Sequence, residues 1–172
     1  MMTLILIGCA KKKQATRSRA ADLYTSPLFR IARSYAEQQV ERRSAVLWGI
    51  LSAHYGLLYP NNHVEPYDLH LATQPAEARR AWGRNVAASL GAAPPEGGVI
   101  EVYAGRAYVD ALRPPMATMG WRVVAPLDRI RGVGSRIRWF LDRIEAEPEP
   151  APVSVPTAHT CPNCGHHYQK AS

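Results

Sequence analysis

The chain has 172 residues, of which 47% are hydrophobic and 20% charged, and its formal net charge is +7. This length and composition fit one globular domain with a real core and exclude a largely disordered chain. No apolar run approaches the roughly 18 residues of a transmembrane helix, so we expect no membrane partner. The excess of Lys and Arg favours a polyanionic partner, although solubility alone would also account for it.

Strands and helices alternate in the predicted secondary structure. Four short apolar runs predict strands buried on both faces of a parallel sheet: Leu4–Ile7, Ala45–Leu51, Val99–Tyr103 and Trp121–Ala125. The helical patterns are Ser26–Glu37, Pro75–Leu90, a segment from Gly105 that stops near Pro114, and Ser135–Glu145. This alternation predicts an α/β fold, a three-layer α/β/α sandwich around a small, mostly parallel four-stranded sheet.

Composition divides the chain into three parts. Residues 1–144 form the predicted α/β domain, which we expect to bind nucleic acid or a nucleotide. Residues 145–157 are rich in Pro and Glu and predict an extended linker, and residues 158–172 form a short tail with a Cys-x-x-Cys motif. Three cysteines without a disulfide pattern, and no basic leader before the first apolar run, favour a reducing, cytoplasmic location.

The first predicted strand ends in a cationic loop. Gly8 and Cys9 are followed by Lys11, Lys12, Lys13 and, four residues on, Arg17. Open α/β sheets bind ligands at the carboxyl ends of their strands, so these cations are placed to contact phosphate. The alternative is a solvated basic loop. Cys9 could be a nucleophile beside the lysines, although such a cysteine is more often a small buried residue.

The segment from Ser52 to Leu69 follows the second strand and is the richest in functional groups. Its eighteen residues contain three aromatic rings, two histidines and two carboxylates. A carboxylate beside a histidine suits general acid–base catalysis or stabilisation of a cationic sugar. The candidates are His54, Glu65 and Asp68, with Tyr55 and Tyr67 as stacking rings. The alternative is that the aromatic side chains only pack the loop.

The third and fourth predicted strands also end near cations. Tyr103 and Arg106 flank the start of a helix, whose backbone amides would favour an anion. Arg129, Arg131 and Arg136 surround a Gly-Val-Gly turn that could cradle a phosphate, faintly resembles a DNA-binding hairpin, or belongs to a solvated face. Because all four strand ends carry cations or rings, we expect one shared, positively charged pocket.

The tail predicts half of a zinc site. Cys161 and Cys164 have the spacing of a zinc knuckle, and His167 is a plausible third ligand. His159, His166 or a second chain could complete the coordination shell. The alternative is an unliganded tail. The α/β domain itself needs no cofactor.

Two stretches resemble known families. The segment Tyr55-Gly-Leu-Leu58, followed by Pro66-Tyr67, resembles the YaaA family of peroxide-stress, DNA-binding proteins, and this resemblance implies DNA binding. Gly8-Cys9 with the three lysines, followed by Leu23-Tyr24 and Ser26–Phe29, resembles an uncharacterised group of bacterial and phage proteins. By fold, that group is distantly similar to the uracil-DNA glycosylase superfamily. The superfamily's Asp-Pro-Tyr and His-Pro-Ser signatures are missing here, so its catalytic residues cannot be carried over.

Three hypotheses of function follow. The first is a DNA-binding enzyme that cleaves or exchanges the glycosidic bond of a damaged or modified base, in DNA repair or phage defence, with Asp68, Glu65 and His54 as catalytic residues. Its nucleic-acid contacts would be Lys11, Lys12, Lys13, Arg17, Ser52, Tyr55, Tyr67, Tyr103, Arg106, Arg129, Arg131 and Arg136. The second is a YaaA-like DNA-binding stress-response protein without chemistry. The third is an enzyme acting on a free nucleotide or nucleoside.

Overall fold

The computed structural model describes residues 2–91 and 97–146, together with the backbone of two short paired strands, β8 (His159–Thr160) and β9 (His167–Tyr168). Within these residues, no helix combines the length and the apolarity that crossing a bilayer requires.

A five-stranded sheet forms the centre of the α/β domain, with the strand order β4-β3-β1-β6-β7. Its strands are β1 (Thr3–Gly8), β3 (Val46–Ser52), β4 (Gly56–Leu58), β6 (Val99–Tyr103) and β7 (Arg122–Val124). The four predicted strands are confirmed and run parallel. The fifth strand, β4, was not predicted; it begins at Gly56, whose φ is 76°, directly after a turn, and pairs antiparallel with β3. The sheet is therefore mixed.

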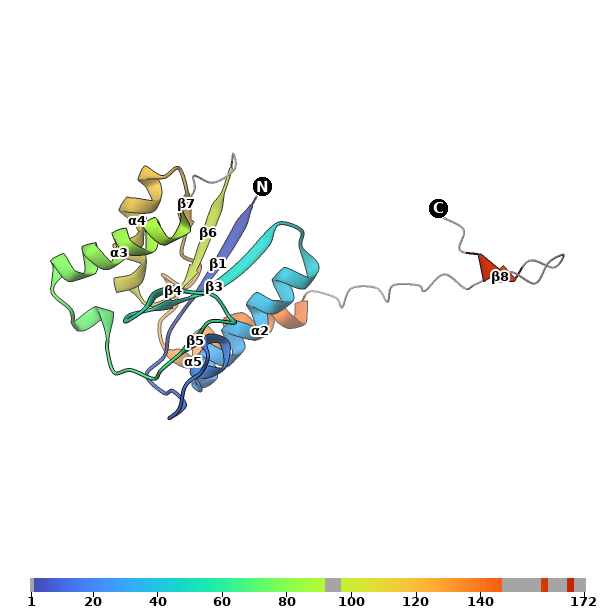
Figure 1. Cartoon of the computed structure of the whole chain (residues 1–172), viewed down its shortest axis with the longest axis horizontal. Helices are drawn as coiled ribbons and strands as arrows, with labels where there is room; N and C mark the ends of the chain where they lie inside the picture. Colours follow the sequence, from blue (N-terminus) through green and yellow to red (C-terminus); the bar gives the residue numbers. More distant parts are fainter. Residues whose placement is uncertain (1, 92–96, 147–158, 161–166, 169–172) are drawn as a thin grey trace.

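Helices cover both faces of this sheet, as the sandwich prediction requires (Figure 1). The α-helices are α1 (Ala20–Leu23), α2 (Pro27–Arg42), α3 (Ala76–Leu90), α4 (Arg106–Thr118) and α5 (Val133–Ala146). Ile5 and Ile7 of β1 are buried in the core that α2 and α5 complete, whereas Leu4 and Leu6 are buried in the core of α3 and α4. The alternation along β1 thus places one apolar layer on each side of the sheet.

The boundaries of α2, α4 and α5 differ from the prediction. Helix α2 continues to Arg42, beyond the predicted end at Glu37. Helix α4 continues through Pro114 and Pro115 instead of stopping at the first of them. Proline removes a backbone hydrogen bond inside a helix, and tertiary packing against α3 offsets that loss here. Helix α5 begins at Val133 and ends at Ala146, so the first two residues assigned to the linker still belong to the helix.

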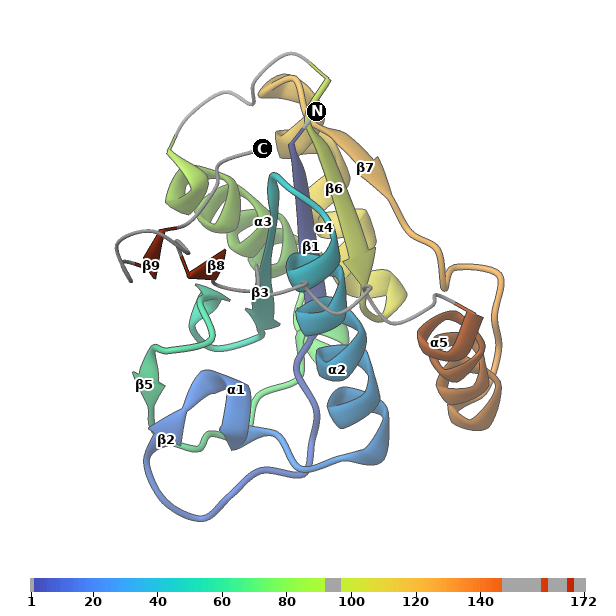
Figure 2. The same cartoon turned by 90° about the vertical axis from the view of Figure 1, so that its right-hand side faces the viewer.

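A small substructure lies beyond the carboxyl ends of β1 and β3 (Figure 2). It consists of α1 and the antiparallel pair β2 (Ser18–Arg19) and β5 (His63–Val64), none of which was predicted. A 3-10 helix, η1 (Leu71–Thr73), precedes α3. These elements surround the strand ends at which the sequence predicted a site.

The strands that follow β1 in the chain are added first on one side of it and then on the other. After β1 it passes through α2 to β3 on one side, and it later returns through α3 to β6 on the other side of β1. The carboxyl ends of β1 and β6 are therefore the topological switch point, where open α/β sheets form their ligand crevice.

Candidate functional site

A cavity of about 260 Å³ opens at this switch point. The ends of β1 and β6 form one wall, and the beginning of α2, helix α5 and the segment 69–72 form the others. Its lining residues that carry chemistry or aromatic surface are Cys9, Lys11, Ser26, Phe29, His70, Tyr103, Tyr108, Arg136 and Phe140. We call this the switch-point cavity.

The lining of the switch-point cavity combines cations with aromatic surface. Phe29 and Phe140 are buried, 3% and 0% exposed, whereas Lys11 is exposed at the rim. Arg136 is held in place because its Nε donates a hydrogen bond to the Ile130 carbonyl, 3.0 Å away. No carboxylate is among the described residues that line this cavity. The site therefore suits an anionic ligand with a flat apolar part.

A cluster of hydroxyl groups lies beside the cavity, around the thiol of Cys9. Cys9 Sγ is 3.1 Å from the Tyr108 hydroxyl. The Tyr67 hydroxyl accepts a hydrogen bond of 2.8 Å from Ser52 Oγ and is 3.0 Å from the Tyr24 hydroxyl. Burial raises the pKa of Tyr24 to about 12 and also raises the pKa of Tyr67 and of Tyr108. At neutral pH these phenols are protonated. Tyr24 and Tyr67 position each other by a hydrogen bond, and Tyr108 pairs with the Cys9 thiol.

Ser52 has a structural role, which corrects its assignment as a nucleic-acid contact. Its side chain is fully buried, at 0% exposure. Ser52 Oγ accepts hydrogen bonds from the backbone N–H groups of His54 and Tyr55, and its carbonyl accepts one of 2.9 Å from Trp82 Nε1. Ser52 therefore fixes the turn between β3 and β4 and has no surface for a nucleic acid.

The three predicted catalytic residues do not converge on the switch-point cavity. The ring of His54 is exposed and stacks on Tyr67, with 5.3 Å between the ring centroids. Glu65 is exposed, and its carbonyl accepts a hydrogen bond of 3.3 Å from the Tyr55 hydroxyl. The side chain of Asp68 is 88% exposed. The predicted triad is thus spread over the outer surface of the loop.

His70 is a site residue that sequence reasoning missed. It lines the switch-point cavity, and its Nε2 is 3.8 Å from Asp68 Oδ1. Asp68 therefore reaches the cavity indirectly, as the carboxylate partner of a histidine at the rim. The only signal in the sequence was the position of His70, two residues after Asp68 and next to the loop that is rich in functional groups.

The basic and aromatic residues predicted to contact nucleic acid do not all lie in one place in the structure. Lys11, Tyr103 and Arg136 line the switch-point cavity, as predicted. The Tyr103 hydroxyl, however, donates to Glu101 Oε2 at 2.8 Å, so this ring serves as packing surface. Lys12 and Arg17, which follow β1 in the chain, and Arg129 and Arg131, which follow β7, are exposed.

Lys13 and Arg106 are among the predicted contacts that lie outside the cavity. Lys13 Nζ lies 4.3 Å from the centroid of the Tyr67 ring, a cation–π contact. Arg106 lines a separate hollow together with Arg79 and Arg80. The single shared pocket that the sequence suggested is therefore at least two neighbouring hollows, and this corrects the prediction.

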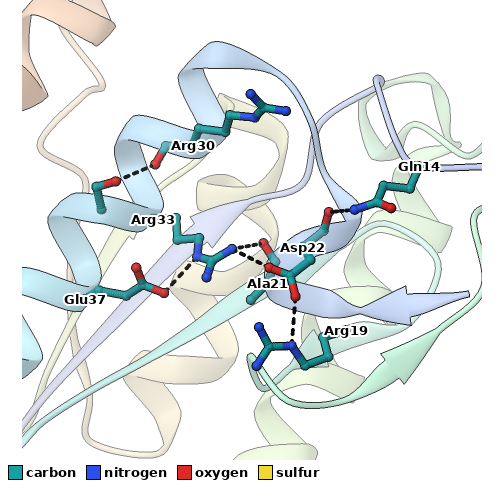
Figure 3. A network of polar contacts seen from close by, with 8 residues as sticks. Gln14, Arg19, Ala21, Asp22, Arg30, Arg33 and Glu37 are labelled. Carbon is teal, nitrogen blue, oxygen red and sulfur yellow. Dashed lines mark hydrogen bonds and ion pairs between the residues drawn. The ribbon is translucent and has the colours of Figure 1, made fainter.

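A polar network lies next to the loop of residues 9–17, which carries Lys11, Lys12 and Lys13 (Figure 3). Asp22 accepts hydrogen bonds of 2.7 Å from Arg33 Nη1 and 2.8 Å from Arg19 Nε. Gln14 Nε2 donates one of 2.8 Å to the Asp22 carbonyl. Gln14 thus connects residues 9–17 to α1, and Asp22 connects α1 to Arg33 of α2 and Arg19 of β2.

The chain matches the model of a known protein family. It is described as a family of unknown function, DUF6884, and it matches residues 4–142. The chain belongs to the DUF6884 family. No curated protein matches the chain. In this DUF6884 protein the matched residues run from β1 to most of α5, so they include the switch-point cavity. The resemblances to YaaA proteins and to the glycosylase superfamily stay predictions.

The described part of this DUF6884 protein holds no group of three or more His, Cys, Asp or Glu residues that could bind a metal ion. The predicted zinc ligands Cys161 and Cys164 lie outside the described residues, and His167 is described by its backbone alone. The zinc site therefore stays a prediction.

Proposed function

We propose that this DUF6884 protein binds nucleic acid, with DNA as the favoured form, and holds one nucleotide of the strand in the switch-point cavity. The observation that carries the proposal is the composition of that cavity. Cations stand at its rim, at Lys11 and Arg136, and buried aromatic rings line its interior, at Phe29 and Phe140. Phosphate contacts from the rim and ring contacts with a base are the two interactions by which proteins hold a single unstacked nucleotide.

The size of the cavity supports a small occupant. Pockets for drug-sized ligands have volumes of roughly 300–1,000 Å³. At about 260 Å³ the switch-point cavity is suited to a base with its sugar and not to a duplex. A base from a strand would have to leave its stack to enter, as in enzymes that flip their target nucleotide.

The cations outside the cavity favour a strand over a free nucleotide. Lys12 and Arg17 follow β1 in the chain, and Arg129 and Arg131 follow β7; all four are exposed and do not line the cavity. A mononucleotide would leave them without a ligand, whereas a strand carries further phosphates past the rim. The formal net charge of +7 is consistent with such a partner.

The pairing of His70 with Asp68 favours a chemical role in addition to binding. His70 Nε2 lies 3.8 Å from Asp68 Oδ1 and the histidine lines the cavity, so the imidazole is placed to exchange a proton with a bound base. In glycosidic-bond hydrolysis, water oxygen bonds to the sugar C1′ as the bond from C1′ to the base nitrogen breaks. The departing base takes up a proton, which His70 would supply, and the proton that the attacking water loses passes to solvent, from which His70 is reprotonated.

Binding is tested with a labelled single-stranded oligonucleotide, followed by fluorescence anisotropy. The double variant Lys11→Gln/Arg136→Gln should bind at least about tenfold more weakly than the wild type, because two charge-assisted hydrogen bonds to phosphate are removed. Arg113→Gln/Arg122→Gln is the matched control, because it removes the same charge from exposed positions that do not line the cavity. Equal affinity of the double variant and the wild type would contradict the proposal.

Catalysis is tested separately, by measuring release of free base from a panel of DNAs with damaged or modified bases. We expect His70→Gln to abolish release and Asp68→Asn to reduce it, while both variants still bind DNA. If the wild type binds DNA but releases no base from any substrate, the glycosidase proposal fails and a binding protein without chemistry remains.

A further inference from the structure

A second hollow, of about 370 Å³, lies between the beginnings of α3 and α4. Its charged lining consists of Arg79 and Arg80 from α3, and Arg106 and Asp110 from α4. The remaining lining residues are small, namely Ala72, Ala76, Ala107 and Ala111. We call this hollow the arginine groove. Only Arg106 among these residues was predicted from the sequence as a site residue.

The arginine groove adjoins the switch-point cavity. Ala72 of η1 lines both hollows, and Gly105 lines the cavity while its neighbour Arg106 lines the groove. Arg79 Nη1 donates a hydrogen bond of 3.3 Å to the Ala72 carbonyl. The guanidinium of Arg79 is thereby held against the wall that the two hollows share.

The charge of the groove is positive, with three guanidinium groups and one carboxylate among its lining residues. Arg80 also bonds to Glu77, at 2.7 Å, and Arg106 Nε is 3.4 Å from Asp110 Oδ2. The Arg80 and Arg106 side chains are 62% and 83% exposed. Ion pairs this exposed contribute little, so a phosphate can compete with the carboxylates for these arginines.

The start of α4 adds to the positive field of the groove. Gly105 precedes the helix and provides no side-chain cap. The first N–H groups of a helix have no partner within the helix and favour an anion. Since three arginines gather at the same place, the helix end strengthens a site that the side chains already define.

We infer that the arginine groove is a second phosphate-binding site, and that it holds the phosphodiester adjacent to the nucleotide in the switch-point cavity. This inference rests on the proposed function, because it takes the cavity as the place of the first nucleotide. The strand then passes over η1 from one hollow to the other. The preferred ligand is therefore single-stranded and at least two nucleotides long, bound through its backbone without regard to base sequence.

The same chemistry could serve the terminal phosphates of a free nucleoside triphosphate, so the experiment has an arm for each source. Affinities for thymidine 5′-monophosphate, thymidine triphosphate, the dinucleotide pTpT and an eight-residue oligothymidylate are measured by calorimetry. The variant is Arg79→Gln/Arg106→Gln. Arg113→Gln/Arg122→Gln is the control, because it removes the same charge from exposed positions that line neither hollow.

We expect the variant to bind pTpT and the oligothymidylate about tenfold more weakly than the control, and to bind the monophosphate equally well. The salt dependence for the oligothymidylate should decrease by about 0.7 in log–log slope for each phosphate that the variant no longer neutralises. A reduction in affinity confined to the triphosphate, or no reduction for any ligand, would overturn the inference.

Failure of this inference can be told apart from failure of the proposed function. If the wild type binds neither the monophosphate nor the oligothymidylate, the proposed function fails and the groove has no strand to hold. If the wild type binds both and the variant matches the control, only the second phosphate site is excluded.

Discussion

Gly8 allows the ends of β1 and β6 to lie close together where they border the cavity. A Cβ at this position would lie 2.9 Å from the Cβ and 3.1 Å from the Cα of Ala104. The ends of β1 and β6 therefore approach so closely that any side chain at Gly8 would push them apart. The close spacing of β1 and β6 at the switch point thus requires glycine at position 8.

We predict that Gly8→Ala lowers the free energy of unfolding by about 1–3 kcal/mol, because the backbone of Ala104 must shift. The same shift should weaken nucleotide binding. Gly134→Ala in α5 is the control, since a Cβ there would meet nothing within 4 Å. Urea unfolding of both variants measures the difference. Equal stability of the two would show that the strand ends have room to separate.

Asp22 provides a prediction about pH. Hydrogen bonds from Arg33 and then from Arg19 lower the pKa of the Asp22 carboxyl below its ordinary value. Its contribution to stability is therefore complete above pH ~4 and is lost as the pH falls through the lowered pKa. Since a third of the side chain is exposed, solvent screening limits that contribution.

Asp22→Asn should accordingly lower the free energy of unfolding at pH 7 by about 1 kcal/mol, and the difference from the wild type should shrink in acid. Asp128 is exposed, so the control substitution Asp128→Asn should change the free energy of unfolding little. Thermal unfolding between pH 2 and 7 measures both. A difference that grows as the pH falls would contradict the assigned role of the network.

At the residue scale, the sequence predicted the site only in part. Lys11 and Arg136 were found because each follows the end of a predicted strand, and topology brings such ends together. His70 was missed because it reaches the cavity through the course of an irregular loop, which no periodicity encodes. Ser52 was assigned to the surface because sequence alone does not reveal its hydrogen bonds to His54 and Tyr55.

At the scale of elements, the strands were predictable because the sheet is buried on both faces and its runs are continuously apolar. Strand β4 was missed because it has three residues, too few for a pattern. The end of α4 was misplaced because local sequence does not show how α4 packs on α3. A Cβ at Gly83 of α3 would collide with the Ala111 carbonyl oxygen of α4. Gly83 thus permits close contact between the two helices.

We predict that Gly83→Ala destabilises the protein by at least about 2 kcal/mol, although alanine normally favours a helix over glycine. The matched control is Gly134→Ala in α5, where a Cβ would meet nothing within 4 Å. That change should be neutral or stabilising by up to about 1 kcal/mol. Chemical denaturation of both variants tests the prediction. A stable Gly83→Ala variant would mean that α3 and α4 can separate at no cost in stability.

At the scale of the whole molecule, the reversal of the chain at β1 places two cationic hollows at one end of the domain. The formal net charge of +7 alone is compatible with solubility. The position of the basic residues is more informative than the net charge, because Lys11 and Arg136 line one hollow and three arginines line the other. The element pattern predicted the layers and the ligand edge, whereas the division of that edge into two sites required the three-dimensional arrangement.

This distribution of charge predicts a steep salt dependence. If a single strand contacts both hollows and the surrounding loop, about four phosphates are neutralised, and the log–log slope of affinity against salt should be about −3. Anisotropy titrations of an oligothymidylate at salt concentrations from low to above physiological give this slope. A slope near zero would show that the basic surface serves solubility.

The central claim is that one nucleotide of a strand occupies the switch-point cavity. Its most direct test is an NMR titration of the ¹⁵N-labelled protein with a short single-stranded oligonucleotide. We expect the largest changes in amide chemical shift at the cavity wall, in residues 8–11, 70–72 and 103–105. Changes confined to other surfaces, or none at saturating oligonucleotide, would contradict the claim.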